Sequence, residues 1–259
     1  MHATRIAVAG AAGRMGQTIL RSIAGDVECT LAGAIEVPGH PRIGSDAGLV
    51  SGGDAIGVAI ASDVTQALRN ADALLDFTVP AVSAALALQV ADAGIVHVIG
   101  TTGFNAEQES RIELAAGRSV IVKSGNMSLG ANVLAALVGQ AARVLRDFDV
   151  QIVEMHHRMK KDTPSGTALM LGRAAMEARH SPSPGAEDRA DTGVGFASLR
   201  GGTVIGEHRV VFAGDYERLI LEHVAEDRSI FARGAIAAAK WGRGQKPGLY
   251  TMLDVLGFS

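Results

Sequence analysis

The sequence predicts an α/β protein with two domains: a doubly wound parallel sheet, then an α+β domain with a mostly antiparallel, open sheet. In the first half, short runs rich in Val, Ile and Leu alternate with helical patterns, as in parallel sheets with crossover helices. After about residue 127, a long amphipathic pattern precedes strand-like runs joined by short glycine turns. The 32 glycines and the aromatic content of 4% favour tight turns and close helix-to-strand contacts.

The first domain is expected to span residues 1–127. Its strands are placed where apolar, β-branched runs are bounded by Gly, Asp or Ser. The expected strands are 5–10, 29–35, 57–60, 71–78, 96–100 and 119–125. Helical patterns fall between most of them, at 17–25, 63–70, 80–93 and 105–117.

The second domain is expected to span residues 128–234. Its expected elements are a helix at 128–147, a strand at 148–155, a helix at 166–179, a proline-rich loop at 181–185, and strands at 193–200, 203–214 and 217–224. The short turns Gly201-Gly202 and Gly214-Asp215 predict two antiparallel hairpins between the last three strands. The segment from about 235 to 259 is helical again, and we expect it to pack on the first domain.

The composition is that of an ordinary globular protein, with 47% hydrophobic residues and a formal net charge of −3. This charge gives no electrostatic reason to bind nucleic acid or an anionic membrane. The sequence has neither an apolar run of about 18 residues nor the apolar segment of a signal peptide. The single cysteine, Cys29, excludes an internal disulfide and fits a reducing compartment. We therefore expect a cytoplasmic protein.

A glycine-rich turn after the first strand predicts a dinucleotide site. Gly10, Gly13 and Gly16 lie in "VAGAAGRMG", where a pyrophosphate binds at a helix N-terminus. The spacing departs from G-x-G-x-x-G, so the glycines also fit simple packing of strand on helix. Glu36 closes the second strand 20 residues after Gly16, where a carboxylate binds the adenine-ribose hydroxyls. Because a carboxylate repels a 2′-phosphate and Val37 is not basic, we expect NADH to be used at least as well as NADPH.

Two further loops are candidates for the nicotinamide end of the cofactor. "GTTG" (100–103) and "SGNMS" (124–128) follow later strands, and the carboxyl ends of parallel strands share one edge of a sheet. Arg14 and Arg42 are basic residues that could reach a 2′-phosphate, so the use of NADPH stays open.

The stretch "EMHHRMKKDTPSGTA" (154–168) predicts a site for a small anion with more than one negative charge. Five basic or potentially basic side chains occupy the six positions 156–161. "TPSGTA" has the form of a helix start, with Pro164 in the first turn and Thr163 or Ser165 as the cap. Such a start adds the positive end of a helix dipole, and His and Lys supply protons for general acid catalysis. A solvated basic loop without a function is the alternative.

Other chemistries fit less well. A metal site is not expected, because the histidines at 180, 208 and 223 lack close-spaced ligand signatures and Lys160 and Lys161 would repel a cation. Short-chain dehydrogenase chemistry needs a lysine four positions after the tyrosine, and neither Tyr216 nor Tyr250 has one there. Cys29 lies in a predicted strand, which disfavours a thiol-dependent dehydrogenase.

The same stretch resembles the signature of the dihydrodipicolinate reductase family, enzymes of bacterial and plant lysine and diaminopimelate synthesis. The family pattern Glu-x-His-x-x-x-Lys-x-Asp-x-Pro-Ser-Gly-Thr-Ala is matched from Glu154 through Ala168. The similarity extends to "VAGAAGRMG", "DFT", "VIGTTGF", "VGFASLRGG", "GEH" and "ARGAIAAAKW", and so covers nearly the whole chain. Two positions differ: Gln151 stands where the family usually has an acidic residue, and Val37 where some relatives carry arginine.

The resemblance implies a set of site residues. His156 would be the general acid/base and Lys160 the proton donor. The substrate carboxylates would be held by His157, Lys160, Ser165, Gly166 and Thr167. The cofactor, NADH or NADPH, would contact Gly10, Ala11, Ala12, Gly13, Arg14, Met15, Glu36, Gly100, Thr101, Thr102, Ser124, Gly125, Asn126 and Met127.

The resemblance also implies an architecture and a reaction. The family has a Rossmann-like domain, a substrate domain whose open sheet builds a homotetramer, and a hinge that closes the two. The implied reaction is hydride transfer from NAD(P)H to C4 of an unsaturated cyclic dicarboxylate, after loss of the 4-hydroxyl, giving tetrahydrodipicolinate. The alternatives are a non-catalytic NAD-binding regulator of the same fold and a reductase of another cyclic imino-dicarboxylate.

Overall fold

The computed structural model describes residues 2–180 and 193–258, and the chain forms two compact units. Unit 1 comprises Met1–Ser128 and Ser229–Ser259, and unit 2 comprises Leu129–Arg228. The loop expected at 181–185 lies outside the described residues. Within the described ranges, every helix is too short or too polar to cross a membrane.

Unit 1 is built on a seven-stranded sheet. Its strands are β1 (Thr4–Ala9), β2 (Cys29–Ile35), β3 (Ile60–Ala61), β4 (Ala73–Asp76), β5 (Val96–Ile99), β6 (Val120–Lys123) and β11 (Gly248–Tyr250). They lie in the order β11-β6-β5-β4-β1-β2-β3, and every pairing between neighbours is parallel. The predicted doubly wound parallel sheet is therefore confirmed. The C-terminal tail was expected to be helical throughout, but it contributes β11 as an edge strand.

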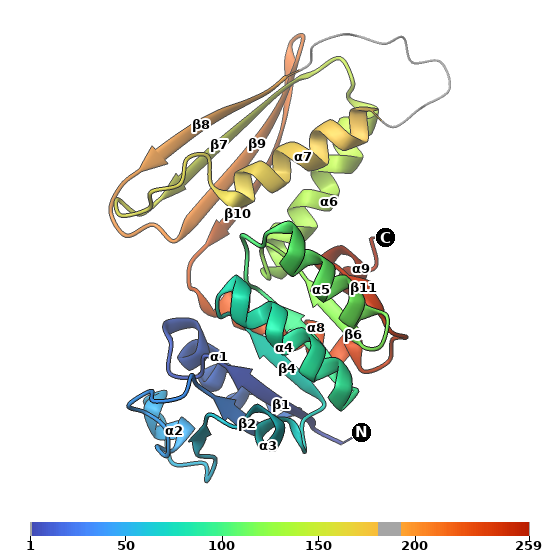
Figure 1. Ribbon diagram of the computed structural model, residues 1–259. Helices are drawn as coiled ribbons and strands as arrows, with labels where there is room; N and C mark the ends of the chain where they lie inside the picture. The colour runs from blue at the N-terminus through green and yellow to red at the C-terminus, as the bar shows by residue number, and fades with distance from the viewer. Residues whose placement is uncertain (1, 181–192, 259) are drawn as a thin grey trace. The chain divides into compact units, whose positions relative to one another are not determined.

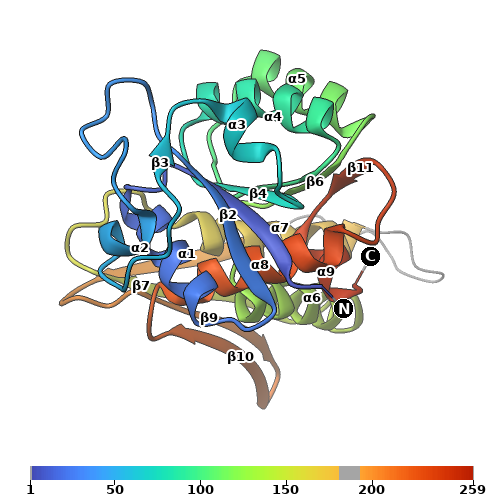
Figure 2. The same cartoon turned by 90° about the horizontal axis from the view of Figure 1, so that it is seen from below.

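Helices connect the strands of unit 1 and cover both faces of the sheet. They are α1 (Arg14–Ala24), α2 (Ala47–Val50), α3 (Val64–Leu68), α4 (Pro80–Ala93), α5 (Ala106–Ala116), α8 (Ser229–Gly242) and α9 (Met252–Leu256). Helices α3, α4 and α5 lie on one face, and α1 and α8 lie on the other (Figure 2). The order of connection reverses between β1 and β4, which is where ligands of such sheets bind.

Unit 2 is a four-stranded sheet covered by two helices on one face (Figure 1). Its elements are α6 (Leu129–Val144), β7 (Asp149–His156), α7 (Gly166–His180), β8 (Val194–Arg200), β9 (Gly206–Gly214) and β10 (Glu217–Ala225). Buried side chains alternate along β7, because successive residues of a strand point to opposite faces. Val150, Ile152, Val210 and Phe212 pack against Leu171 and its neighbours on the helices.

The strand order of unit 2 is β10-β9-β7-β8, which corrects one prediction. The hairpin expected at Gly214-Asp215 is confirmed, since β9 and β10 pair antiparallel. The hairpin expected at Gly201-Gly202 is wrong: β8 pairs parallel with β7, and β9 pairs with the opposite edge of β7. A parallel partner must be reached by a crossover connection, and α7 supplies it.

The face of this sheet opposite α6 and α7 carries apolar side chains that nothing in the described chain covers. Leu199, Ile220 and Val224 are 52%, 50% and 50% exposed. Their strand partners are Met155, Val211 and Glu207. Side chains of paired residues lie on the same face, and these three partners alternate along β7 and β9 with the residues that face the core.

Candidate active site

The glycine turn after β1 leaves the start of α1 open. Gly10 has a φ of 68°, a left-handed conformation that favours glycine. Gly13 is the N-cap, and no side chain of residues 2–180 or 193–258 caps the helix. A Cβ at Gly16 would lie 2.1 Å from the Gly10 carbonyl oxygen, so Gly16 is required for helix packing. The N–H groups of Arg14 and Met15, in the first turn, have no partner within the helix, which suits an anion.

Glu36 lies beside this turn, as the sequence predicts. Its carboxylate accepts hydrogen bonds from the N–H of Ala12 at 2.9 Å and of Val37 at 3.3 Å. The N–H groups of Gly10 and Ala11 donate to the Ile35 carbonyl, so they hold the turn on β2 and are not available to a ligand. Of the predicted cofactor contacts, the N–H groups at the start of α1 and the Glu36 carboxylate are therefore more accessible to a ligand than the N–H groups of Gly10 and Ala11.

The two later loops follow β5 and β6 at the same edge of the sheet. Gly100 is needed because a Cβ there would lie 2.2 Å from the Phe77 ring. Thr101 is buried and Thr102 is exposed. In the second loop, the hydroxyl of Ser124 donates to the Asn126 carbonyl at 2.9 Å, and Gly125 is exposed. The Met127 side chain is 1% exposed and belongs to the core, so only its backbone could meet a cofactor.

Sequence reasoning missed a buried carboxylate–histidine pair in unit 1. His97 Nε2 lies 3.2 Å from Asp76 Oδ2, and neither side chain is exposed. The other carboxylate oxygen of Asp76 accepts from the Thr78 N–H at 3.0 Å and hydroxyl at 2.6 Å. Burial would raise the pKa of Asp76, but the bonds from His97 and Thr78 lower it below its ordinary value. The "DFT" match contained this signal, although no role was given to it.

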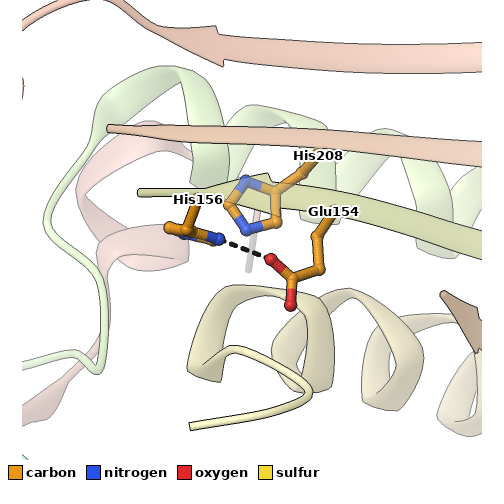
Figure 3. Close-up of side chains that lie close together, drawn as sticks. All are labelled: Glu154, His156 and His208. Atoms are coloured by element: carbon orange, nitrogen blue, oxygen red, sulfur yellow. Dashed lines mark hydrogen bonds and ion pairs between the residues drawn. The ribbon is translucent and has the colours of Figure 1, made fainter. Parts of the chain in front are cut away.

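The second unit places His156 against Glu154, with which it shares one face of β7 because the two residues are two positions apart (Figure 3). His156 Nδ1 lies 2.5 Å from Glu154 Oε2. Glu154 is 1% exposed and His156 is 7% exposed. Since a carboxylate accepts the hydrogen bond, Nδ1 carries the proton and Nε2 is the nitrogen left for a ligand. A Cβ at Gly206 would lie 3.0 Å from Nε2, so this glycine keeps that edge of the ring uncrowded.

Arg200 holds the same carboxylate from the neighbouring strand. Its Nη1 lies 2.9 Å from Oε2 and its Nη2 lies 2.8 Å from Oε1 of Glu154. Arg200 is beside His156 in the parallel register of β7 and β8. Burial would raise the pKa of Glu154, but hydrogen bonds from Arg200, Ser198 and His156 lower it to about 2. Glu154 is therefore ionised at every physiological pH.

His208 completes the cluster from β9, opposite Glu154. Its ring centroid lies 5.0 Å from that of His156 with an interplanar angle of 75°, and its Nε2 lies 3.1 Å from the Ser165 hydroxyl. Burial, and then repulsion by a protonated His156, lower the pKa of His208 to about 4. Burial also lowers the pKa of His156, against the opposing effect of Glu154. His208 is thus neutral at pH 7.

Glu154, His156 and His208 bring their ligand atoms within 4.8 Å of one another, which is close enough to hold a metal ion. However, the carboxylate already accepts hydrogen bonds from His156 and from both ends of the Arg200 guanidinium. The guanidinium charge opposes a second cation at the same oxygens. The cluster fits acid–base chemistry better than metal binding.

Three of the predicted substrate residues, Ser165, Gly166 and Thr167, lie at the start of α7. Ser165 is the cap, since the Ala168 N–H donates to its hydroxyl at 3.2 Å. The helix begins at Gly166, so Pro164 lies before the cap. The expectation that Pro164 lies in the first turn is therefore wrong. The Ser165 N–H donates to Glu154 Oε1 at 3.3 Å, which joins the helix start to the cluster. Gly166 is exposed and Thr167 is half-buried.

The basic stretch divides into two parts. His156 points inward to Glu154, whereas Arg158 and Lys161 are exposed and His157 is half-buried. Lys160 is 22% exposed, and its Nζ lies 2.9 Å from Asp162 Oδ2. The sequence predicted one site from this stretch, but it missed Arg200 and His208, which bond or contact Glu154 and His156. The matched segments "VGFASLRGG" and "GEH" contained both of them without indicating a role.

Comparison with known proteins agrees along the whole chain. The family model described as "Dihydrodipicolinate reductase, N-terminus" matches residues 4–127, and that described as "Dihydrodipicolinate reductase, C-terminus" matches residues 130–256. The 4-hydroxy-tetrahydrodipicolinate reductase of Methylocella silvestris is 54% identical over 263 residues, which cover 98% of this chain and 97% of that protein. The enzyme of the same name from Brucella abortus is 53% identical over 265 residues, covering 98% and 99%.

A solved structure shares the fold at much lower identity. The dipicolinate-bound dihydrodipicolinate reductase of Paenisporosarcina sp. TG-14 has a TM-score of 0.79 and 23% sequence identity, and the match covers 97% of this chain and 98% of that one.

Proposed function

The chain belongs to the dihydrodipicolinate reductase family and is an NAD(P)H-dependent oxidoreductase, and we propose that His156 and Lys160 carry out its acid–base chemistry. The reaction is the reduction of 4-hydroxy-tetrahydrodipicolinate to tetrahydrodipicolinate in lysine and diaminopimelate synthesis. The observation that carries the residue assignment is the buried Glu154–His156 hydrogen bond of 2.5 Å at the foot of the basic loop.

The proposed acid–base roles follow from the geometry of unit 2. Glu154 fixes the proton of His156 on Nδ1, so Nε2 is the atom that exchanges a proton with the substrate. Lys160 has three N–H donors and loses little by leaving its partly exposed partner Asp162. The bound nicotinamide dinucleotide supplies the hydride, and Lys160 donates the proton that accompanies it.

The two carboxylates of the substrate are proposed to bind at the start of α7, with His157, Lys160, Ser165, Gly166 and Thr167 as the contacts. The positive end of the helix dipole and the lysine charge both favour an anion there. The exposed Arg158 and Lys161 add a positive field around the same loop.

Unit 1 is proposed to hold the dinucleotide. The uncapped start of α1 suits the pyrophosphate, and Glu36 beside it suits the ribose hydroxyls. Because the Glu36 carboxylate repels a 2′-phosphate and Val37 offers no positive charge, NADH is expected to serve at least as well as NADPH. The remaining proposed contacts come from Gly100 to Thr102 and Ser124 to Met127.

We also propose a homotetramer in the cytoplasm. The apolar side chains of Leu199, Ile220 and Val224 form an uncovered sheet face, and such faces are usually buried against another copy or partner. The Cys29 thiol is buried, and burial raises its pKa to about 11, which fits an unreactive thiol in a reducing compartment. Light scattering of an Ile220→Lys variant tests the assembly: a mass that stays tetrameric would remove this face from the interface.

The test of the function is an assay of reduced-nicotinamide absorbance. The substrate is generated in place from pyruvate and aspartate semialdehyde by the preceding synthase, with NADH and NADPH in separate runs. Oxidation that depends on the synthase is the expected result. A kcat/KM for NADPH above that for NADH would contradict the role given to Glu36.

A Lys160→Ala variant in the same assay separates two roles of this lysine. A proton donor is expected to lower kcat by roughly two to four orders of magnitude. A carboxylate anchor would instead raise KM with kcat held.

A further inference from the structure

Five polar side chains in unit 1 form a buried chain of polar contacts that ends at Thr101. His97 bonds Asp76, whose other oxygen accepts from the Thr78 hydroxyl at 2.6 Å. Thr78 Oγ1 lies 3.2 Å from Ser83 Oγ, and the Ser83 hydroxyl donates to Thr101 Oγ1 at 2.8 Å. Asp76, Ser83 and His97 have no exposed surface, and Thr101 is 7% exposed. The reaction proposed above uses none of the first four.

This chain of polar side chains adjoins the loops proposed for the cofactor. Asp76 is the last residue of β4, Ser83 lies in the first turn of α4, and Thr101 follows β5. A Cβ at Gly10 would lie 3.2 Å from Thr78 Cγ2, so the glycine turn also rests on this chain. The chain therefore touches both the pyrophosphate turn and the "GTTG" loop.

The direction of the hydrogen bonds follows from the ionised Asp76. A carboxylate can only accept, so the Thr78 proton goes to Asp76. Ser83 then has one proton for two neighbouring oxygens, and its shorter bond is the one to Thr101. Thr101 accepts that bond, which leaves its own hydroxyl proton to donate elsewhere. Within the described residues, no bond donated by the Thr101 hydroxyl is found.

Strand order indicates which half of the cofactor this proton would meet. In the sheet, β1 with its glycine turn lies between β2 on one side and β4 and β5 on the other. Glu36, at the end of β2, is on the adenine-ribose side. Thr101, at the end of β5, is on the opposite side of the pyrophosphate turn, where the nicotinamide half belongs.

We propose that Ser83 is a positioning residue for the cofactor, which orients the Thr101 hydroxyl so that it donates to the carboxamide oxygen of the nicotinamide. This inference rests on the proposed cofactor site in unit 1. Thr78, whose own proton goes to Asp76, lies against Ser83 with no proton between the two hydroxyls. The Thr101 hydroxyl proton has no acceptor among the described residues, which is expected if its acceptor is a ligand.

Calorimetric titration of the full-length protein with NADH and with ADP-ribose, which lacks the nicotinamide, tests this role. Ser83→Ala and Thr101→Val are expected to weaken NADH binding about 3- to 10-fold, the loss of one hydrogen bond, and to leave ADP-ribose binding unchanged. The Ser83→Ala/Thr101→Val double variant should bind NADH no more weakly than Thr101→Val, because both changes remove the same contact. Thr101→Ser keeps the hydroxyl and should recover most of the NADH affinity that Thr101→Val loses.

Ser119→Ala is the matched control. Ser119 is also buried, and its hydroxyl donates to the Ala115 carbonyl at the opposite edge of the sheet. It should change neither titration. Unchanged NADH binding in Ser83→Ala, or an equal loss for NADH and ADP-ribose, would overturn the positioning role. A wild type that binds neither compound would instead overturn the cofactor site itself, so the two failures are distinguishable.

Discussion

The two units each contain a buried carboxylate–histidine pair, and the pairs differ in what surrounds them. In unit 1, Asp76 and His97 are 3.2 Å apart, neither is exposed, and the further partners are hydroxyl and backbone groups. In unit 2, Glu154 and His156 are 2.5 Å apart, the His156 side chain is 9% exposed, and Arg200 and Lys160 add positive charge.

The difference shows that a carboxylate–histidine pair has no fixed role. The unit 1 pair is sealed, so its histidine has no route to a substrate and it can only orient the groups bonded to it. In unit 2, Arg200 keeps Glu154 ionised, and the uncrowded Nε2 edge of His156 can exchange a proton. The surroundings, more than the pair itself, therefore decide between orientation and chemistry.

The largest effect is expected from His156→Gln. Gln has no group that titrates near pH 7, so kcat should fall by roughly two to four orders of magnitude. Binding of NADH, measured by calorimetry, should be unchanged because His156 belongs to unit 2. His180→Gln, a change at an exposed histidine on α7, is the control for a general histidine effect. Wild-type turnover by His156→Gln would contradict the claim that the unit 2 pair takes part in catalysis and the unit 1 pair does not.

The next largest effect is expected from Asp76→Asn in the sealed pair, and it concerns stability. The change removes the carboxylate that His97 and Thr78 bond, and leaving buried hydrogen-bond partners unsatisfied costs about 1 to 3 kcal/mol of unfolding free energy. Because the pKa of Asp76 is lowered in the folded protein, its stabilisation is present above about pH 4 and is lost as the pH falls further. Denaturant titrations at pH 7 and pH 3 should show a large wild-type-to-variant difference at pH 7 and a smaller one at pH 3.

The matched change in unit 2, Glu154→Gln, should alter the pH profile of catalysis. Burial lowers the pKa of His156, and Glu154 counteracts this. A general acid works when protonated, so the rate falls as the pH rises through that pKa. Without the Glu154 charge the pKa of His156 should be lowered further, so this fall should occur at lower pH and kcat/KM at pH 8 should decrease. Asp76→Asn should leave the shape of the profile unchanged, and an identical shift in both variants would argue against separate roles.

The smallest effect is expected from His208→Gln, which can keep the bond to Ser165. The pKa of His208 is about 4 in the folded protein against 6.5 for an ordinary histidine. The unfolded chain thus takes up a proton below pH 6.5 that the folded protein refuses, so stability falls between pH 6.5 and about 4. The variant should lose less stability than the wild type between pH 7 and pH 5, by about 1 to 2 kcal/mol. Parallel stability curves would show that this histidine is not held neutral.

Much of the fold and of the candidate site could be predicted because the relevant signals are local. Alternating strand and helix patterns predicted the parallel sheet of unit 1, and the glycine turn predicted a helix after β1, although α1 begins at Arg14 and not at the expected residue 17. Glu36 lies beside that turn as expected, because β2 runs next to β1. The basic stretch and the cap at Ser165 lie within a few residues of His156, so one short segment contained most of the unit 2 site.

The tertiary structure alone decided which distant groups meet those local ones. Arg200 reaches Glu154 across 46 residues because β8 pairs parallel with β7, whereas the glycine turn suggested a hairpin with β9. His208 lies on β9, the other neighbour of β7. In unit 1, the polar side chains from His97 to Thr101 come from β4, α4, β5 and the segments that follow the two strands. Hydrophobic periodicity identifies a strand and its buried face, but it contains no information about which strand becomes its neighbour. Strand order depends on the path of the crossovers and the packing of the whole unit, and that order brought Arg200 and His208 to the Glu154–His156 pair.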